Sequence, residues 1–273
     1  MEMNGRIIVT GATGGMGAAA VEALAAQGKP VLMACRNLGK AEAVRTDILR
    51  RIPEADLQVG KLDLSSLSSV RSFAAGIEPG SVSGIFHNAG VISKKHILTE
   101  DGFENTFSVN YFGPWILTLL LLPKLPAGAR IVSMVSLTCR FAPLKESMLQ
   151  PSERDFSQLR TYARAKRALL SFSLELARRH PDLRVHLADP GIVGSDMIDL
   201  GHWFDPLADI LFKPFCKTPS KGVQPALRAL STTEDSTRYY VGKAARAVPR
   251  RYLDPLLDKR IWEKTVLLVN PWL

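Results

Sequence analysis

Hydrophobic and polar positions follow a repeated order along the first two-thirds of the chain. Short apolar runs rich in Val, Ile, Leu and Ala predict strands, and the longer stretches between them, with apolar positions at helical spacing, predict helices. Strands are expected at residues 6–10, 30–35, 56–61, 82–87, 130–135 and 183–188, with a last one at 239–242. Helices are expected at residues 15–27, 38–52, 65–77, 102–122 and 161–179. This alternation predicts an α/β fold, a doubly wound parallel sheet with helices on both faces.

Three stretches depart from this repeat. Residues 141–160 are predicted to form a surface loop, and residues 196–219 hold aromatic and aliphatic residues at helical spacing between prolines. That second stretch is predicted to be a small helical insertion after the sixth strand. No shift in composition marks a domain boundary, so residues 1–273 are expected to form a single domain that ends in a tail over residues 243–273.

Length and composition exclude several classes of protein. The 273 residues are 46% hydrophobic and 22% charged, which suits a chain with a large core and excludes disordered, collagen-like and disulfide-scaffold proteins. The longest strongly apolar run, residues 115–122, is shorter than the about 20 residues of a membrane span, and the N-terminus does not resemble a signal peptide. Cys35, Cys139 and Cys216 are too few and too scattered for a disulfide framework or a zinc site. We therefore expect free thiols, no metal and a cytoplasmic location.

The formal net charge of +9 leaves three kinds of anionic partner open: nucleic acid, a membrane surface and phosphorylated small molecules. No nucleic-acid-binding motif accompanies the charge, so nucleic acid is not expected. The tail is basic over residues 243–264 and apolar after residue 265. It could dock peripherally on an anionic membrane. The favoured alternative is a solvated basic face with a tail that packs on the domain or on a neighbouring subunit.

Glycines gather where the first strand meets the first helix, in the spacing G-x-x-x-G-x-G through Gly11, Gly15 and Gly17. Glycines let the backbone turn sharply and approach a pyrophosphate, and the helix N-terminus then directs its free N–H groups at the anion. Because a strand precedes this loop and a helix follows it, the pattern predicts a dinucleotide-binding site.

Five further segments, in order along the chain, extend this pattern into a resemblance to the short-chain dehydrogenase/reductase family. They are Asn88-Ala89-Gly90, Asn110, Ser136, the run from Tyr162 to Lys166, and Pro190-Gly191. The resemblance covers about residues 6–197 and is closest in pattern to retinol dehydrogenase-like and hydroxysteroid dehydrogenase-like members. It implies a Rossmann fold, an oxidoreductase acting on CH–OH groups, a nicotinamide cofactor and a helical substrate lid over residues 196–219.

The proposed catalytic residues are Asn110, Ser136, Tyr162 and Lys166. Tyr162 and Lys166 are four residues apart, so they share one face of a helix. A nearby ammonium is expected to lower the tyrosine pKa from about 10, which makes Tyr162 the predicted general acid and base. The resemblance gives Ser136 a hydrogen bond to the substrate oxygen, Lys166 a contact with the nicotinamide ribose, and Asn110 a water-linked relay to Lys166.

NADP(H) is the expected cofactor because Arg36 ends the second strand, where NAD-specific members usually place an acidic residue. A guanidinium suits the 2′-phosphate, and Asn37 and Lys40 are expected to assist it. Arg36 can also stack on adenine, so NAD(H) stays open as an alternative. The full set of predicted cofactor contacts is Gly11, Thr13, Gly14, Gly15, Met16, Gly17, Arg36, Asn37, Lys40, Asp63, Leu64, Asn88, Ala89, Gly90, Tyr162, Lys166, Pro190, Gly191, Val193 and Ser195.

The insertion points to a hydrophobic small-molecule substrate, such as a steroid, bile acid or retinoid. Predicted substrate contacts are Leu137, Trp203, Phe204 and Phe212. The leading hypothesis is interconversion of an alcohol and a ketone or aldehyde. Reduction of a conjugated C=C bond and a non-catalytic NADP(H) sensor remain as alternatives. By the resemblance, a homodimer or homotetramer is expected to form through the helices at residues 102–122 and 161–179.

Overall fold

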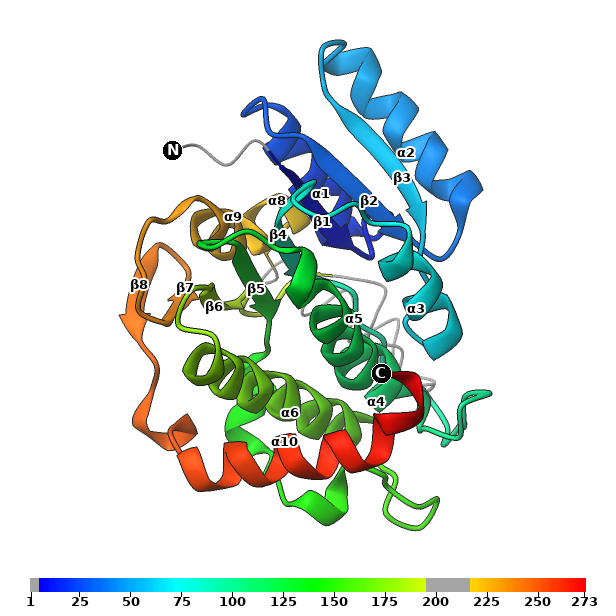
Figure 1. Cartoon of the computed structure of the whole chain (residues 1–273), viewed down its shortest axis with the longest axis vertical. Helices are drawn as coiled ribbons and strands as arrows, with labels where there is room; N and C mark the ends of the chain where they lie inside the picture. Colours follow the sequence, from blue (N-terminus) through cyan, green and yellow to red (C-terminus); the bar gives the residue numbers. More distant parts are fainter. Residues whose placement is uncertain (1–4, 195–216) are drawn as a thin grey trace.

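An eight-stranded sheet runs through the computed structural model, which describes residues 5–194 and 217–273 (Figure 1). Its strand order is β3-β2-β1-β4-β5-β6-β7-β8; β8 pairs antiparallel with β7, and all the other described pairs are parallel. The strands are β1 (Arg6–Thr10), β2 (Val31–Cys35), β3 (Leu57–Lys61), β4 (Val82–His87), β5 (Arg130–Met134), β6 (Arg184–Asp189), β7 (Arg238–Val241) and β8 (Ala244–Ala247).

Helices cover both faces of the sheet. Helices α1, α2 and α9 pack on one face, and α3, α5 and α6 pack on the other, with α10 lying along α6 (Figure 1). The described helices are α1 (Gly15–Ala25), α2 (Leu38–Arg51), α3 (Leu67–Ala75), α4 (Asn105–Phe107), α5 (Gly113–Leu121), α6 (Gln158–Arg179), α8 (Pro219–Gly222), α9 (Gln224–Ser231) and α10 (Pro255–Val269). The predicted doubly wound α/β fold is confirmed.

Each central strand contributes side chains to two hydrophobic cores. Successive residues of a strand point to opposite faces, so Ile8 and Leu32 join the core beneath α5 and α6, while Val9 and Met33 join the core beneath α1. The sheet is therefore apolar on both sides, which explains why its strands read as short continuous hydrophobic runs.

The order of the strands reverses between β1 and β4. The chain builds β1, β2 and β3 in one direction and then crosses back to place β4 on the other side of β1. At such a reversal the connections that leave the two neighbouring strands diverge, and a crevice opens beyond the carboxyl ends of the strands. The glycine loop after β1 and the Asn88-Ala89-Gly90 segment after β4 both lie at this point.

The predicted long helix over residues 102–122 is interrupted. It begins as α4, passes through a π-helical turn η1 (Ser108–Phe112) and continues as α5. The segment Asn105–Lys124 has the length and apolar composition of a membrane-crossing helix, but 78% of its most apolar window is buried inside the protein. The π turn carries Asn110, and turns of this kind are frequent at functional sites.

Residues 243–273 contain a strand and a helix where a tail was expected. A tight turn at Gly242 (φ +54°) allows β8 to pair with β7, and α10 then crosses α6. Trp262 of α10 lies 5.3 Å from Trp115 of α5 and 5.7 Å from Phe172 of α6, measured between ring centroids. Asp258, which is fully buried, binds Arg178 at 2.7 Å. This helix therefore packs along α6 and reaches α5 through Trp262, so it borders the helices through which pairing was expected.

Of the two internal stretches that depart from the strand–helix repeat, residues 141–160 are described in full and residues 196–219 only at their end. Of the predicted loop 141–160, residues 142–157 connect η3 to α6 and include a short 3-10 turn, η4 (Glu146–Met148), while residues 158–160 already belong to α6. Leu144 and Leu149 of this connection enter the core. Residues 196–216 of the other insertion lie outside the described residues, together with the predicted contacts Ser195, Trp203, Phe204 and Phe212. Its stem is described: the amide of Gly194 donates to the carbonyl of Lys217 at 3.1 Å.

Candidate active site

The loop between β1 and α1 is shaped to receive an anion. Gly11 adopts a φ of +64°, and a side chain at Gly17 would collide with the carbonyl oxygen of Gly11. Gly14, the N-cap of α1, provides no side-chain cap, and the first turn of α1 holds no acidic residue. The first N–H groups of the helix are therefore free to bind a phosphate, with the helix dipole favouring its negative charge.

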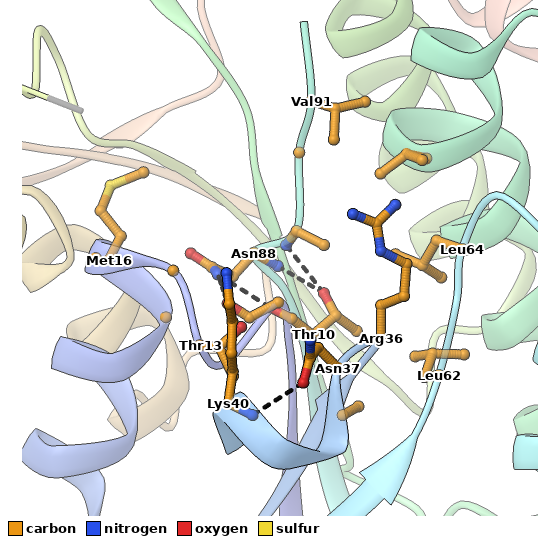
Figure 2. Close-up of a pocket in the computed structure, with 18 of the residues that line it drawn as sticks. Thr10, Thr13, Met16, Arg36, Asn37, Lys40, Leu62, Leu64, Asn88 and Val91 are labelled. Atoms are coloured by element: carbon orange, nitrogen blue, oxygen red, sulfur yellow. Dashed lines mark hydrogen bonds between the residues drawn. The ribbon is translucent and has the colours of Figure 1, made fainter. Parts of the chain in front are cut away.

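This loop borders a cleft of about 640 Å³ at the reversal of strand order (Figure 2). The predicted cofactor residues that line it are Gly11, Thr13, Gly14, Gly15, Met16, Gly17, Arg36, Asn37, Lys40, Asp63, Leu64, Asn88, Ala89, Gly90 and Val193. Tyr162, Lys166, Pro190 and Gly191 are not among the lining residues. The cleft is large enough for an extended dinucleotide. The uncapped N-terminus of α1 suits its pyrophosphate, and Arg36 and Lys40 add positive charge.

The end of the cleft next to β2 is basic. Arg36 and Lys40 are exposed, and both side chains project into the space between the glycine loop and Leu64 (Figure 2). The side-chain oxygen of Asn37 accepts from the amide of Lys40 at 2.9 Å and so caps α2. Lys61 donates to the carbonyl of Arg36 at 2.7 Å, which adds a third positive charge at this strand end. A doubly charged phosphate would find donors here, whereas a ribose hydroxyl would find no carboxylate at the end of β2.

Asp63 at the end of β3 serves first as a local anchor. Its Oδ1 accepts from the amide of Ser65 at 2.9 Å and from the hydroxyl of Ser65 at 2.6 Å. Its other carboxylate oxygen is not used in these two bonds, so Asp63 can still meet a ligand in the cleft that it lines.

A small hydrogen-bond network joins the end of β1 to the segment that follows β4. The Thr10 hydroxyl accepts from the amides of Asn88 and Ala89, each at 3.0 Å. The Asn88 side chain donates to the carbonyl of Thr10 at 2.9 Å. These bonds fix the Asn88-Ala89-Gly90 segment against the glycine loop and so set the width of the cleft.

Beyond Gly90 lie the side chains with predicted catalytic roles. A side-chain carbon built on Gly90 would stand 2.8 Å from Oδ1 of Asn110 and 3.4 Å from Nζ of Lys166. Asn110 donates to the carbonyls of Val91 at 2.8 Å and Thr106 at 2.7 Å, and its buried Oδ1 has no partner among the described residues. A buried acceptor of this kind is normally satisfied by water. The geometry thus fits the predicted relay between Asn110 and Lys166.

Tyr162 and Lys166 rise from the same face of α6 toward the ends of β5 and β6. The Lys166 ammonium lies 5.9 Å from the centroid of the Tyr162 ring and donates to the carbonyl of Met134 at 3.0 Å. Ser136 begins the 3-10 turn η3 (Leu137–Phe141), and a hydrogen bond from Ser136 stabilises the Tyr162 phenolate. Leu137, a predicted substrate contact, follows it and is half-buried.

The pKa of Tyr162 differs from expectation. Burial raises it above its ordinary value of 10, the neighbouring Cys139 adds to the rise, and the hydrogen bond from Ser136 opposes it. Burial also lowers the pKa of Lys166 to about 8. The prediction of a lowered tyrosine pKa is therefore wrong for the protein alone, because desolvation of the buried phenol is the largest influence and Lys166 is not among the groups that oppose it. The positive ring of an oxidised nicotinamide would act against this rise.

The Pro190-Gly191 turn after β6 is held from two sides. Asp189 accepts from the amide of Gly191 at 2.8 Å and from the hydroxyl of Tyr239 at 2.7 Å. The Lys217 ammonium donates to the carbonyl of Pro190 at 2.9 Å. These bonds hold a turn that the resemblance places against the nicotinamide.

Several site residues were not identified from the sequence. The cleft is also lined by Thr10, Ala34, Leu62, Val91, Val109, Gly194 and Pro219. Thr10, Ala34 and Leu62 lie at or next to strand ends, a position that could have indicated them. Lys217 could not have been found, because the insertion separates it from the turn that it holds. Within the described residues, no group of three or more His, Cys, Asp or Glu side chains could hold a metal ion.

Comparison with known proteins places these features in context. The model of the short chain dehydrogenase family matches residues 6–200. Human retinol dehydrogenase 13 is 32% identical, with 97% of this chain and 84% of that protein covered. A crystal structure of an uncharacterized protein from Mycobacterium paratuberculosis superposes with a TM-score of 0.78 at 30% identity, over 97% of this chain and 93% of the other. A short-chain dehydrogenase from Sphingobium yanoikuyae, solved in complex with NADPH, gives a TM-score of 0.61 at 19% identity over 82% and 83% of the chains.

Proposed function

The chain belongs to the short-chain dehydrogenase/reductase family of NAD(P)-dependent oxidoreductases, and we propose that it uses NADP(H) to interconvert an alcohol and a ketone or aldehyde on a bulky hydrophobic substrate. One observation carries the proposal most directly. Asn110 and Lys166 come from separate elements yet meet beside Gly90, which lines the cleft, and Tyr162 and Ser136 continue this group from Lys166.

The proposed reaction requires a hydride and a proton, and the side chains at the site account for the proton. The cofactor, when bound, supplies or accepts the hydride. Tyr162, whose raised pKa keeps it protonated at neutral pH, donates its proton to the carbonyl oxygen in reduction and recovers it in oxidation. Ser136 donates a hydrogen bond to the same oxygen as negative charge develops there. Lys166 holds the nicotinamide ribose and exchanges protons with a water that the buried oxygen of Asn110 would hold.

The preference for NADP(H) rests on the basic end of the cleft. Arg36 and Lys40 are exposed and line it, and Lys61 lies beside Arg36. A bidentate guanidinium contact with a phosphate is among the stronger charged hydrogen bonds in proteins. The short-chain dehydrogenase from Sphingobium yanoikuyae, which shares the fold, was solved in complex with NADPH, in keeping with this proposal.

A hydrophobic substrate is proposed on two grounds. The insertion at residues 196–219 is rich in aromatic and aliphatic residues, and human retinol dehydrogenase 13 is similar over nearly the whole chain. A retinoid, a steroid or another bulky apolar carbonyl compound is therefore the class to assay first.

The proposal is tested by following NADPH oxidation, with NADH in parallel, against retinal, ketosteroids and simple aldehydes. Tyr162→Phe is expected to cost about 10²–10⁴ in rate because the proton donor is lost. Turnover of no carbonyl compound by the unaltered enzyme, or near-normal turnover by Tyr162→Phe, would overturn it.

Cofactor choice is tested separately with Arg36→Ala. Loss of a charged hydrogen-bonding group is expected to weaken NADPH binding by about 10- to 100-fold and NADH binding much less. Arg50→Ala, an exposed arginine in the following helix, is the matched control and should change neither. Equal losses for both cofactors would rule out the phosphate contact.

A further inference from the structure

The hydroxyl of Ser136 receives two hydrogen bonds from a single neighbour. The amide of Thr138 donates to Ser136 Oγ at 3.2 Å, and the hydroxyl of Thr138 donates to the same oxygen at 2.9 Å. A serine hydroxyl has one proton to donate and two lone pairs that accept. Thr138 therefore occupies both acceptor sites of Ser136, and the proton of Ser136 is left to point elsewhere.

Tyr162 is a hydrogen-bonding neighbour of Ser136 that this proton can reach. Because Thr138 uses both lone pairs of the Ser136 oxygen, Ser136 is left as the donor toward Tyr162, and its hydrogen bond there favours the phenolate. We propose that Thr138 is a positioning residue: it holds the Ser136 hydroxyl as a donor toward Tyr162 and the reacting oxygen. This inference rests on the proposed function, because it concerns the direction of hydrogen bonds within the same site.

The direction matters because a hydroxyl can rotate. If Ser136 lacked the hydroxyl bond from Thr138, it could turn its lone pairs toward Tyr162 and accept the tyrosine proton. In that orientation it would stabilise the neutral tyrosine and offer no donor to the substrate oxygen. An aligned donor acts on the charge that develops in the transition state and has no reorientation to make at that moment.

A purely structural role is the competing explanation. Ser136 is the N-cap of η3, and the bonds from Thr138 could serve only to close that turn. The two roles differ in what they predict. A structural role affects stability and every kinetic constant together, whereas a positioning role acts through Ser136 alone and changes how Tyr162 ionises.

The test compares Thr138→Val, which keeps the shape and removes the hydroxyl, with Thr138→Ser, which retains the donor. For Thr138→Val we expect kcat for carbonyl reduction to fall about tenfold with little change in KM, as for a lost neutral hydrogen bond. The pH dependence of alcohol oxidation should shift to higher pH, since the phenolate loses support. Thr138→Ser should stay within about twofold of the unaltered enzyme. Thr46→Val, at an exposed position of α2, is the control.

A double-mutant cycle with Ser136→Ala decides whether Thr138 acts through Ser136. The double variant should be no slower than Ser136→Ala alone. Additive losses, an unchanged pH profile in Thr138→Val, or equal losses in Thr138→Ser and Thr138→Val would each overturn the inference.

A second readout does not depend on turnover. The ionisation of Tyr162 can be followed by ultraviolet difference titration, with Tyr162→Phe as the blank. Thr138→Val should raise this pKa, and an unchanged titration contradicts the inference even if no substrate is found. Absence of turnover in the unaltered enzyme, by contrast, would count against the proposed function and not against the role of Thr138.

Discussion

The state of Lys166 should govern how the enzyme binds its cofactor above neutral pH. Burial lowers the pKa of this lysine to about 8, and its side chain is only 2% exposed. With that pKa, the charged fraction falls from about 90% at pH 7 to about 10% at pH 9. The proposed contact with the nicotinamide ribose needs the ammonium. We therefore expect kcat/KM for NADPH to be nearly constant from pH 6.5 to 7.5 and to fall about tenfold by pH 9.

Neighbouring groups should not produce a step in this range. The pKa of His87 is lowered to about 3 by burial and by Lys166, and burial raises the pKa of Cys139 to about 11. The pKa of Tyr162 is raised above 10. The 2′-phosphate of the cofactor titrates near pH 6, as phosphate monoesters do, and is fully charged above pH 8. The step near pH 8 is thus assigned to Lys166 alone.

The assay combines NADPH fluorescence titrations with initial rates across this pH range, and circular dichroism checks that the fold is retained. Lys166→Met is the matched control: its affinity for NADPH should be lower at every pH, without the step. A flat profile to pH 9 in the unaltered enzyme, or the same step in Lys166→Met, would refute this reasoning.

Three other predictions concern packing and access. Trp262→Ala should destabilise the fold by about 3–5 kcal/mol, or about 10 °C in Tm, because this ring fills the junction of α5, α6 and α10. Leu267→Ala, on the same helix but 75% exposed, should stay within about 0.5 kcal/mol in urea unfolding, and equal effects would contradict the packing argument. Gly90→Ala places a methyl group 2.8 Å from Oδ1 of Asn110, so kcat should fall while Tm changes little; normal turnover would show that the relay tolerates the displacement. Because α10 packs along α6, we expect no self-association through α6, and cross-links between the α6 helices of two copies would disprove this.

Local sequence patterns were enough to predict the central strands and the glycine loop. A parallel strand buried on both faces tends to be apolar throughout, and residues 31–35, Val-Leu-Met-Ala-Cys, show this in sequence as they do in burial. The glycines were identified for a similar reason: a backbone that must turn at Gly11 and admit a helix at Gly17 leaves no room for other residues. Most predicted cofactor residues consequently line one cleft.

Features that depend on contacts between residues far apart in the chain were not predicted from the sequence. The strand β8 reads Ala-Ala-Arg-Ala, with no β-forming signal, and it exists because β7 offers a free edge beside a glycine turn. Helix α10 was predicted as a tail, because its few apolar core positions can be recognised only once α6 is seen to pack against them. The roles of Ser195, Trp203, Phe204 and Phe212 stay predictions.

Neighbouring residues were enough to indicate the alternation of strands and helices, the glycine loop and the candidate acid–base residues, because each of these is encoded locally by residues with fixed backbone demands. The electrostatics of the site, by contrast, follow from long-range packing. The pKa values of Tyr162 and Lys166 depend on how much water the folded chain excludes, and the donor direction of Ser136 depends on Thr138 in the turn that follows. Burial and hydrogen-bond direction are properties of the packed molecule, so no spacing of residues along the chain could have specified them.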